Sequence, residues 1–449
     1  MDQNGDKLIT HPIPSLIKEI AIPAIVGFFF NTMFNVVDTF YGGLLSTEAL
    51  AALSLSFPVF FIIIAIGSGL STGSTTLIAN ALGAGKPEEA KTLAVQSITL
   101  SILFSLALSF AGILISPLLF TLLGATAQYL SLSLDYMNVI FFGTVFFMLA
   151  YTLNAVLSAI GNTKIFRNFL VVGCLLNVLL DPWFMYGWFG FPALGLKGVA
   201  LATIVIQVFG CVYMAFKIKH LGLLSGMNIK DYYPKLSVFS HIASQGVPAA
   251  LNMFTVGIGI FVITYFISPF GKEAVAAYGI ATRVEQIFLL PTIGLTIATL
   301  TLVGQNNGAH RKDRVEETWR TCIRYGMYIM TIGTLGIFFF ASKFMELFTH
   351  DPLVISSGIV YLKIAAFITW AYALLFISVS ALQGLKKPLY PLWIGLARQI
   401  VAPIIVFTLT ARAFGIVGIW WGIFAITWAA AFITLFYLKN VLTHSPHRV

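Results

Sequence analysis

Long apolar stretches dominate the chain, and short polar turns separate them. We count twelve such stretches, most of them at least as long as the roughly 20 apolar residues that a helix needs to cross a bilayer. The pattern therefore predicts an all-α membrane protein with twelve transmembrane helices. The predicted spans cover 15–45, 53–83, 92–116, 127–151, 163–187, 194–218, 240–268, 275–305, 317–341, 354–380, 388–411 and 416–440.

The second half of the chain repeats the first half at a shift of 225 positions. Glu48–Ala52 aligns with Glu273–Ala277 in a register without gaps. Each half holds six spans, so both should enter the membrane in the same direction, related by a pseudo-two-fold axis along the membrane normal. Parallel repeats of this kind are typical of transporters. We expect an N-lobe at 1–219, a cytoplasmic linker at 220–239 and a C-lobe at 240–449.

The charge distribution agrees with a membrane protein. Charged residues make up 10% of the 449 residues, against about 25% in a soluble protein. The net charge is +9, and the basic residues gather in loops on one side, such as Lys164 with Arg167 and Lys217 with Lys219. The positive-inside rule places this side and both termini in the cytoplasm. No basic stripe with interleaved aromatic residues indicates nucleic-acid binding.

The cysteines and the N-terminus point to no metal site and no leader. Cys174, Cys211 and Cys322 lie in separate apolar stretches without metal-ligand spacing. The polar N-terminus leads directly into a full-length span, so we expect no removable signal peptide. The expected location is the cell (inner) membrane, crossed many times.

The first span carries an acid inside its apolar run. Asp38 follows Asn31 and Asn35 at seven and three residues, which puts all three on one helical face. A carboxylate at the bilayer centre costs roughly 3 kcal/mol or more, so such a residue usually faces a bundle interior or a wet cavity. Pro23, which aligns with Pro248 in the repeat, removes a backbone donor and favours a bend. The alternative is a solvated acid near the membrane surface.

Other polar residues of the first half lie at the depth of this acid. Asp38 is about seven residues from the outer end of span one, and Asp181 is about six from the outer end of span five. Asn177 lies one turn deeper than Asp181 on the same face. Spans four and six add, at a similar depth, Tyr136 and Thr203, with Gln207 one turn further.

The chemistry of this set follows if its side chains converge. Two poorly solvated carboxylates cannot both ionise cheaply, so the site would take up a proton near neutral pH. Alternatively, carboxylate, amide and hydroxyl oxygens suit a small hard cation such as Na⁺. Either ion would change the preferred packing of the first span. Simpler interpretations are an interfacial capping acid for Asp181 and ordinary interhelical hydrogen bonds for Tyr136 and Thr203.

The second half lacks counterparts of these acids. At the repeat shift, Asp38 aligns with Ile263 and Asp181 with Val406, so we place the ion coupling in the first half. Arg283 and Glu285 lie in span eight and point to different faces. They are either structural charges or contacts for substrate or a second proton.

The run NVVDTFYGGLLSTEALAALSLSFP at 35–58 resembles the first span and following loop of multidrug and toxic compound extrusion (MATE) transporters, closest to the DinF-like branch. The turns Gly83–Lys86 and Gly161–Lys164 also match, and the similarity covers the whole chain. It implies two six-helix lobes. The NorM-like branch of the family carries acids in spans seven and ten, whereas spans 240–268 and 354–380 here contain no Asp or Glu, which argues against a coupling site in the second half. The N-lobe polar network that the resemblance implies comprises Asp38, Tyr136, Asn154, Asn177 and Asp181, with Thr203 as the threonine of span six.

Together these features predict an antiporter that exports hydrophobic, often cationic organic compounds in exchange for H⁺. The coupling residues would be Asp38, Asp181, Asn177, Tyr136 and Thr203, and weaker candidates for substrate binding are Asn31, Asn35, Asn154, Gln207, Arg283 and Glu285. Na⁺ coupling at Asp38, Asn177 and Asp181 stays open. So does a flippase for a lipid-linked precursor, although only Arg283 and Arg398 could supply embedded cations for pyrophosphate. No motif indicates an enzyme or a cofactor, and we expect a monomer.

Overall fold

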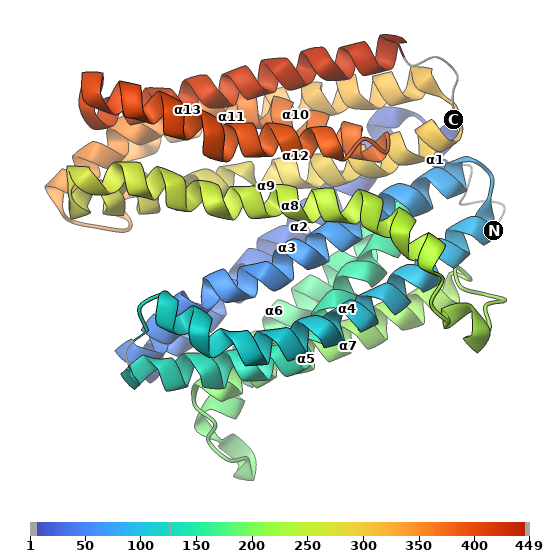
Figure 1. Cartoon of the computed structure of the whole chain (residues 1–449), viewed down its shortest axis with the longest axis horizontal. Helices are drawn as coiled ribbons and strands as arrows, with labels where there is room; N and C mark the ends of the chain where they lie inside the picture. Colours follow the sequence, from blue (N-terminus) through green and yellow to red (C-terminus); the bar gives the residue numbers. More distant parts are fainter. Residues whose placement is uncertain (1–6, 126, 445–449) are drawn as a thin grey trace. The chain divides into compact units, whose positions relative to one another are not determined.

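The computed structural model describes residues 7–125 and 127–444, and within these ranges all regular structure is helical (Figure 1). The helices of the first half are α1 (Lys7–Thr10), α2 (Ile13–Leu45), α3 (Thr47–Gly83), α4 (Pro87–Leu122), α5 (Ala127–Ala159), α6 (Thr163–Tyr186), η1 (Trp188–Gly190) and α7 (Leu196–His220). Those that follow are η2 (Ile229–Tyr232), α8 (Leu236–Ile267), η3 (Ser268–Phe270), α9 (Lys272–Gly308), α10 (Lys312–Glu346), α11 (Pro352–Gly384), α12 (Leu389–Leu396), η4 (Ala397–Val401) and α13 (Ala402–His444).

The long helices confirm the predicted all-α membrane fold. Eleven segments in the described part of the chain are long and apolar enough to cross a bilayer. The last segment, Leu389–His444, contains the two final predicted spans. Gly415 divides it with φ 60° and ψ −147°, a conformation that is essentially open only to glycine. The segment therefore accounts for the difference between eleven and twelve.

The helix bounds reproduce the sequence repeat. Moved by 225 residues, α3 and α5 fall on the bounds of α9 and α11, and α4 falls on α10 to within one residue. The repeat therefore extends from the sequence motifs to whole helices, because equivalent turns end equivalent spans.

The helices form two compact units. The first comprises Ile22–Ala250, and the second comprises 7–21 with 251–444. α2 thus contributes its first turns to the second unit, and α8 contributes its first turns to the first unit. The two repeat-related prolines lie beside these crossings, Pro23 in α2 and Pro248 in α8. The predicted lobe boundaries at 219 and 240 stay a prediction, because the contact units divide the chain inside two helices.

In the first unit, close helix contacts position the polar residues. α2 approaches α6 at Gly27, where an added Cβ would lie 3.2 Å from Cα of Arg167. α7 approaches α6 at Gly198, whose Cβ would lie 2.6 Å from the carbonyl oxygen of Phe184. α2, α6 and α7 therefore pack at small residues, as membrane helices commonly do.

Candidate functional site

The candidate site forms where α2 meets α6. Asp38 comes from α2, and Asn177 and Asp181 come from successive turns of α6. The spacing of four residues puts the last two on one helical face. Asn177 and Asp181 are fully buried, whereas Asp38 is half-buried. A capping acid at the membrane surface does not fit the burial of Asp181.

One carboxamide joins the two acids. Nδ2 of Asn177 donates to Oδ1 of Asp38 at 2.9 Å and to Oδ1 of Asp181 at 2.9 Å. An amide nitrogen carries two hydrogens, so both are used on carboxylates. Oδ1 of Asn177 and Oδ2 of Asp181 are buried without a hydrogen-bond partner. The cluster is therefore rich in acceptors and short of donors.

Two tyrosines flank the cluster. Tyr136 on α5 is buried and close enough to both Asp38 and Asp181 to interact with them electrostatically. Tyr41 lies one turn beyond Asp38 on α2 and donates its hydroxyl to the carbonyl oxygen of Val178 at 3.0 Å. Sequence reasoning missed Tyr41, although its three-residue spacing from Asp38 is a signal that could have found it.

The remaining predicted residues of α5 and α7 do not hydrogen-bond the acids in the described structure. Thr203 is buried and donates to the carbonyl oxygen of Val199 in its own helix at 3.0 Å. Asn154 on α5 is half-buried and accepts a bond from Ser158 at 3.4 Å, one turn away. Gln207 is half-buried on α7. No hydrogen bond that the described residues form links these three to the acids, and their roles stay predictions.

The asparagines of α2 do not join the cluster. Asn31 and Asn35 are exposed in the described chain, and Nδ2 of Asn35 donates to the carbonyl oxygen of Asn31 at 2.8 Å. Pro23 is buried, and α2 continues through it as one helix. Of the three residues predicted to share a face of α2, only Asp38 forms a hydrogen bond with α6, while the amide of Asn35 bonds within α2.

The second unit contains a separate buried acid. Glu285 on α9 is 5% exposed and accepts a bond from the hydroxyl of Tyr361 at 3.1 Å, while its Oε1 has no partner. Arg283 is exposed, as the spacing of two residues predicts. The guanidinium of Arg398 lies 5.6 Å from the ring centre of Tyr372. Glu285 and Arg398 thus each lie beside an aromatic side chain.

The geometry of the α2–α6 cluster suits binding of a small cation. A proton would supply the missing donor, and a metal cation of charge one would be held by the open amide and carboxylate oxygens. Because the acids come from two helices, occupation of the site would alter the contact between those helices.

Comparison with known proteins places this geometry in context. The sequence model of the MatE family matches residues 23–183 and 248–409, two stretches that begin 225 residues apart. The FAD transporter of Shewanella oneidensis is 28% identical over 403 residues, or 89% of this chain and 88% of the relative. The probable multidrug resistance protein NorM of Thermotoga maritima is 29% identical over 443 residues, or 95% and 93%. A solved MOP superfamily transporter from Pyrococcus furiosus has a TM-score of 0.90 at 24% identity over 98% of both chains.

Proposed function

This chain belongs to the MatE family and is therefore a membrane transporter and not an enzyme, and we propose that it exports hydrophobic, often cationic organic compounds in exchange for H⁺. The cargo class is supported by relatives such as the NorM protein of Thermotoga maritima, whose name describes multidrug resistance. The coupling ion is argued from this chain's own residues. The DinF-like branch stays a prediction.

The bridging carboxamide of Asn177 is the observation that carries the coupling proposal. It binds one acid on each of two helices and leaves two buried acceptors open. Burial disfavours charge on both acids at once, so a proton is the simplest ion that neutralises the pair. Thr203 and Tyr136 would then shape the cluster from α7 and α5.

Protonation would act on the packing of α2. An ionised Asp38 accepts from Asn177, whereas a protonated Asp38 can itself donate to an open acceptor. The changed hydrogen bonds would favour a different packing of α2 against α6. Pro23 gives α2 a point at which the backbone lacks a donor, and it follows directly on the residue at which the chain changes from the second compact unit to the first. We therefore place the bend at Pro23.

Na⁺ is the competing coupling ion. Oxygens of Asp38, Asn177 and Asp181 are the ligand type that a hard cation prefers. A three-oxygen set leaves room for further ligands, and the open acceptors could serve either ion. Vesicle transport driven by a pH gradient or by a Na⁺ gradient, each imposed alone, separates the two ions.

The cargo also has competitors. The FAD transporter of Shewanella oneidensis shows that a relative of this chain is named for an anionic dinucleotide. A lipid-linked precursor would need cations for its pyrophosphate, and of the two candidates Arg283 is exposed and Arg398 lies against an aromatic ring. Hydrophobic, often cationic organic compounds remain the favoured cargo, because relatives such as the NorM protein of Thermotoga maritima are named for multidrug resistance.

The membrane arrangement follows from the loop charges. We propose a monomer in the inner membrane with both termini in the cytoplasm, and lobes at 1–219 and 240–449 joined by 220–239. Accessibility of single introduced cysteines to an impermeant reagent in intact cells would test this topology.

Vesicle transport with one imposed gradient at a time tests the coupling. We expect a pH gradient to drive accumulation of a fluorescent organic cation, and Asp38→Asn to abolish it, because the neutral variant cannot exchange a proton. Asp135→Asn is the matched control, since Asp135 also lies in the first unit but pairs with Lys197 at 3.1 Å near the surface. This control should retain nearly full transport.

The outcomes are distinct. Transport driven by a Na⁺ gradient alone would replace H⁺ with Na⁺ as the coupling ion. Full activity in the Asp38→Asn variant would contradict the role of the cluster under either ion. Accumulation of FAD in place of the cation would keep the coupling site and change the cargo.

A further inference from the structure

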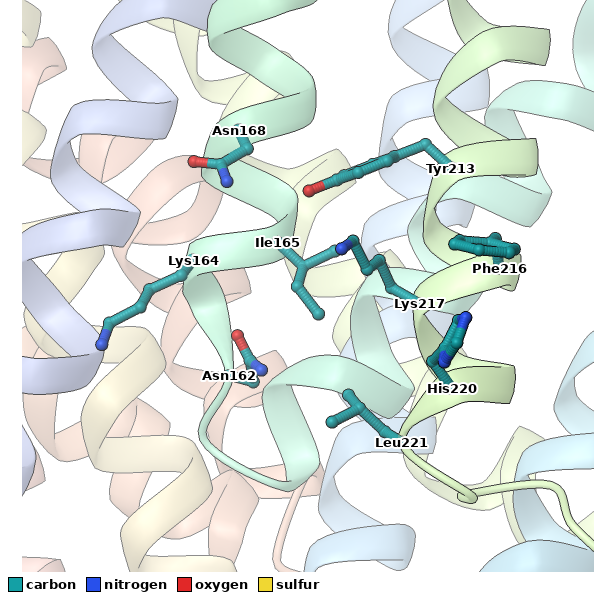
Figure 2. Close-up of a pocket in the computed structure, with 9 residues that line it drawn as sticks. All are labelled: Asn162, Lys164, Ile165, Asn168, Tyr213, Phe216, Lys217, His220 and Leu221. Atoms are coloured by element: carbon teal, nitrogen blue, oxygen red, sulfur yellow. The ribbon is translucent and has the colours of Figure 1, made fainter.

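A pocket of about 500 Å³ lies between the start of α6 and the end of α7, within the first unit (Figure 2). These helices run in opposite directions, so the pocket sits at one end of the pair. Tyr213 and Lys217 extend from α7 toward α6 in Figure 2. The lining residues are Asn162, Lys164, Ile165, Asn168, Tyr213, Phe216, Lys217, His220 and Leu221.

The polar lining offers donors and positive charge. None of the described lining residues is acidic. Lys217 forms no ion pair within the described chain, and its ammonium lies 5.8 Å from the ring centre of Tyr213. Arg167 donates twice to Oδ1 of Asn168, at 3.0 and 2.7 Å, which leaves the amide hydrogens of Asn168 free to point elsewhere. The pocket therefore suits an anion.

Apolar stripes continue from the pocket along both helices. On α6 the exposed residues Val172, Leu175 and Leu179 follow Asn168 at helical spacing. On α7 the exposed residues of the matching stripe, read away from the pocket, are Phe216, Val212, Phe209 and Val205. Their exposed fractions, 55%, 65%, 45% and 39%, show that the described protein does not cover them. A ligand that continued from the anion along these stripes would have apolar chains.

We propose that this pocket binds the phosphate group of an anionic phospholipid, whose acyl chains lie along the α6 and α7 stripes. Basic pockets between transmembrane helices are a known setting for anionic headgroups. A free phosphate ion would use the donors but not the stripes. The lipid uses both, and the stripes begin at residues of the pocket itself. The proposal is independent of the coupling ion and cargo discussed above.

Native mass spectrometry of the purified full-length chain tests this site. Phosphatidylglycerol, phosphatidylcholine, glycerol 3-phosphate and inorganic phosphate would each be added separately. We expect the protein to retain phosphatidylglycerol preferentially, and Lys217→Gln to weaken retention about fivefold, which corresponds to one lysine's attraction to an anionic headgroup. Lys217→Arg should restore binding, because it returns the charge. Lys219→Gln is the matched control, since Lys219 is exposed on the same helix outside the pocket.

A second variant tests the apolar half of the site. Phe209→Ser should lower retention of phosphatidylglycerol without changing the charge of the pocket. Equal retention by wild type and Lys217→Gln, or equal retention of phosphatidylcholine, would overturn the proposal. Binding of inorganic phosphate as tight as that of the lipid would assign the pocket to a free ion and would also overturn it.

Discussion

Asn177 is the residue on which the candidate site depends. Its amide is the only donor that the described structure shows reaching both Asp38 and Asp181. A buried acceptor that loses its donor costs free energy comparable to the desolvation of that group. The arrangement therefore makes one uncharged side chain responsible for the contact between two acids.

Asn177→Ala should disable both folding stability and exchange. We expect the free energy of unfolding to fall by roughly 1–3 kcal/mol, because two carboxylates lose a donor, and drug exchange in vesicles to fall to background. Thr144→Ala is the control, since Thr144 is buried in the same unit and donates to the carbonyl oxygen of Ile140 in its own helix at 3.1 Å. Normal exchange by the Asn177 variant would show that the acids act without their bridge. Thermal unfolding in detergent and the vesicle assay measure the two effects.

At the residue scale, the burial of the acids could be predicted from the sequence, whereas their hydrogen-bond partners could not. The depth and spacing of Asp38, Asn177 and Asp181 follow from helical geometry, which is local. The hydroxyl of Thr203 bonds its own helix and Asn35 bonds the backbone one turn earlier, and these choices depend on packing. The contact from Tyr41 to Val178 spans 137 positions of the chain, a distance that no local pattern encodes.

At the element scale, glycines set how closely α3 and α8 approach. An added Cβ at Gly73 would lie 2.6 Å from the backbone nitrogen of Gly246, and one at Gly69 would lie 2.6 Å from its carbonyl oxygen. Backbone atoms cannot move aside as a flexible side chain can. Helix pairs in membranes rely on such small residues because packing, and not a hydrophobic driving force, holds them together.

Gly73→Ala should therefore force α3 and α8 apart. We expect lower thermal stability and reduced exchange, because the added methyl meets the backbone of Gly246. Gly279→Ala is the matched control, since an added Cβ there meets nothing within 4 Å. That variant should be neutral or more stable by roughly 0.5–1 kcal/mol, as expected for Ala in a helix interior. Similar behaviour of the two variants would show that the close approach is not required.

The elements themselves were predictable to different degrees. The spans follow from hydropathy, because a run of about 20 apolar residues has few alternatives. The π-helical segment Ala397–Val401 and the break at Gly415 did not follow, because both are local departures within one long apolar run. Glycine at 415 was visible in the sequence, but glycines are frequent in membrane helices. Its conformation could be recognised only from the structure.

At the scale of the whole molecule, the linker after α7 is held to the first unit by two side chains of α4, Gln96 and Thr99, of which Thr99 donates its hydroxyl to the carbonyl oxygen of Tyr232 at 3.1 Å. Nε2 of Gln96 on α4 donates to the carbonyl oxygens of Asp231 at 2.6 Å and Tyr233 at 2.9 Å. Oε1 of Gln96 accepts from the nitrogen of Lys235 at 2.8 Å. Gln96 is fully buried, so these bonds are shielded from water. The linker connects the two predicted lobes along the chain, and these bonds tie it to α4 of the first unit.

Gln96→Leu should loosen this linker while leaving the helices folded, because only the bond from Thr99 would remain. Three hydrogen bonds of roughly 0.5–1.5 kcal/mol each would be lost, so we expect trypsin to cleave at Lys230 or Lys235 about tenfold faster or more. Thr92→Val is the matched control, because the Thr92 hydroxyl on the same helix donates to the carbonyl oxygen of Glu88, within α4 and away from the linker. Equal cleavage rates for the variant, the control and wild type would contradict an anchoring role. A loosened linker with unchanged exchange would show that anchorage protects the connection, whereas slower exchange would show that transport requires the lobes to move against a fixed linker.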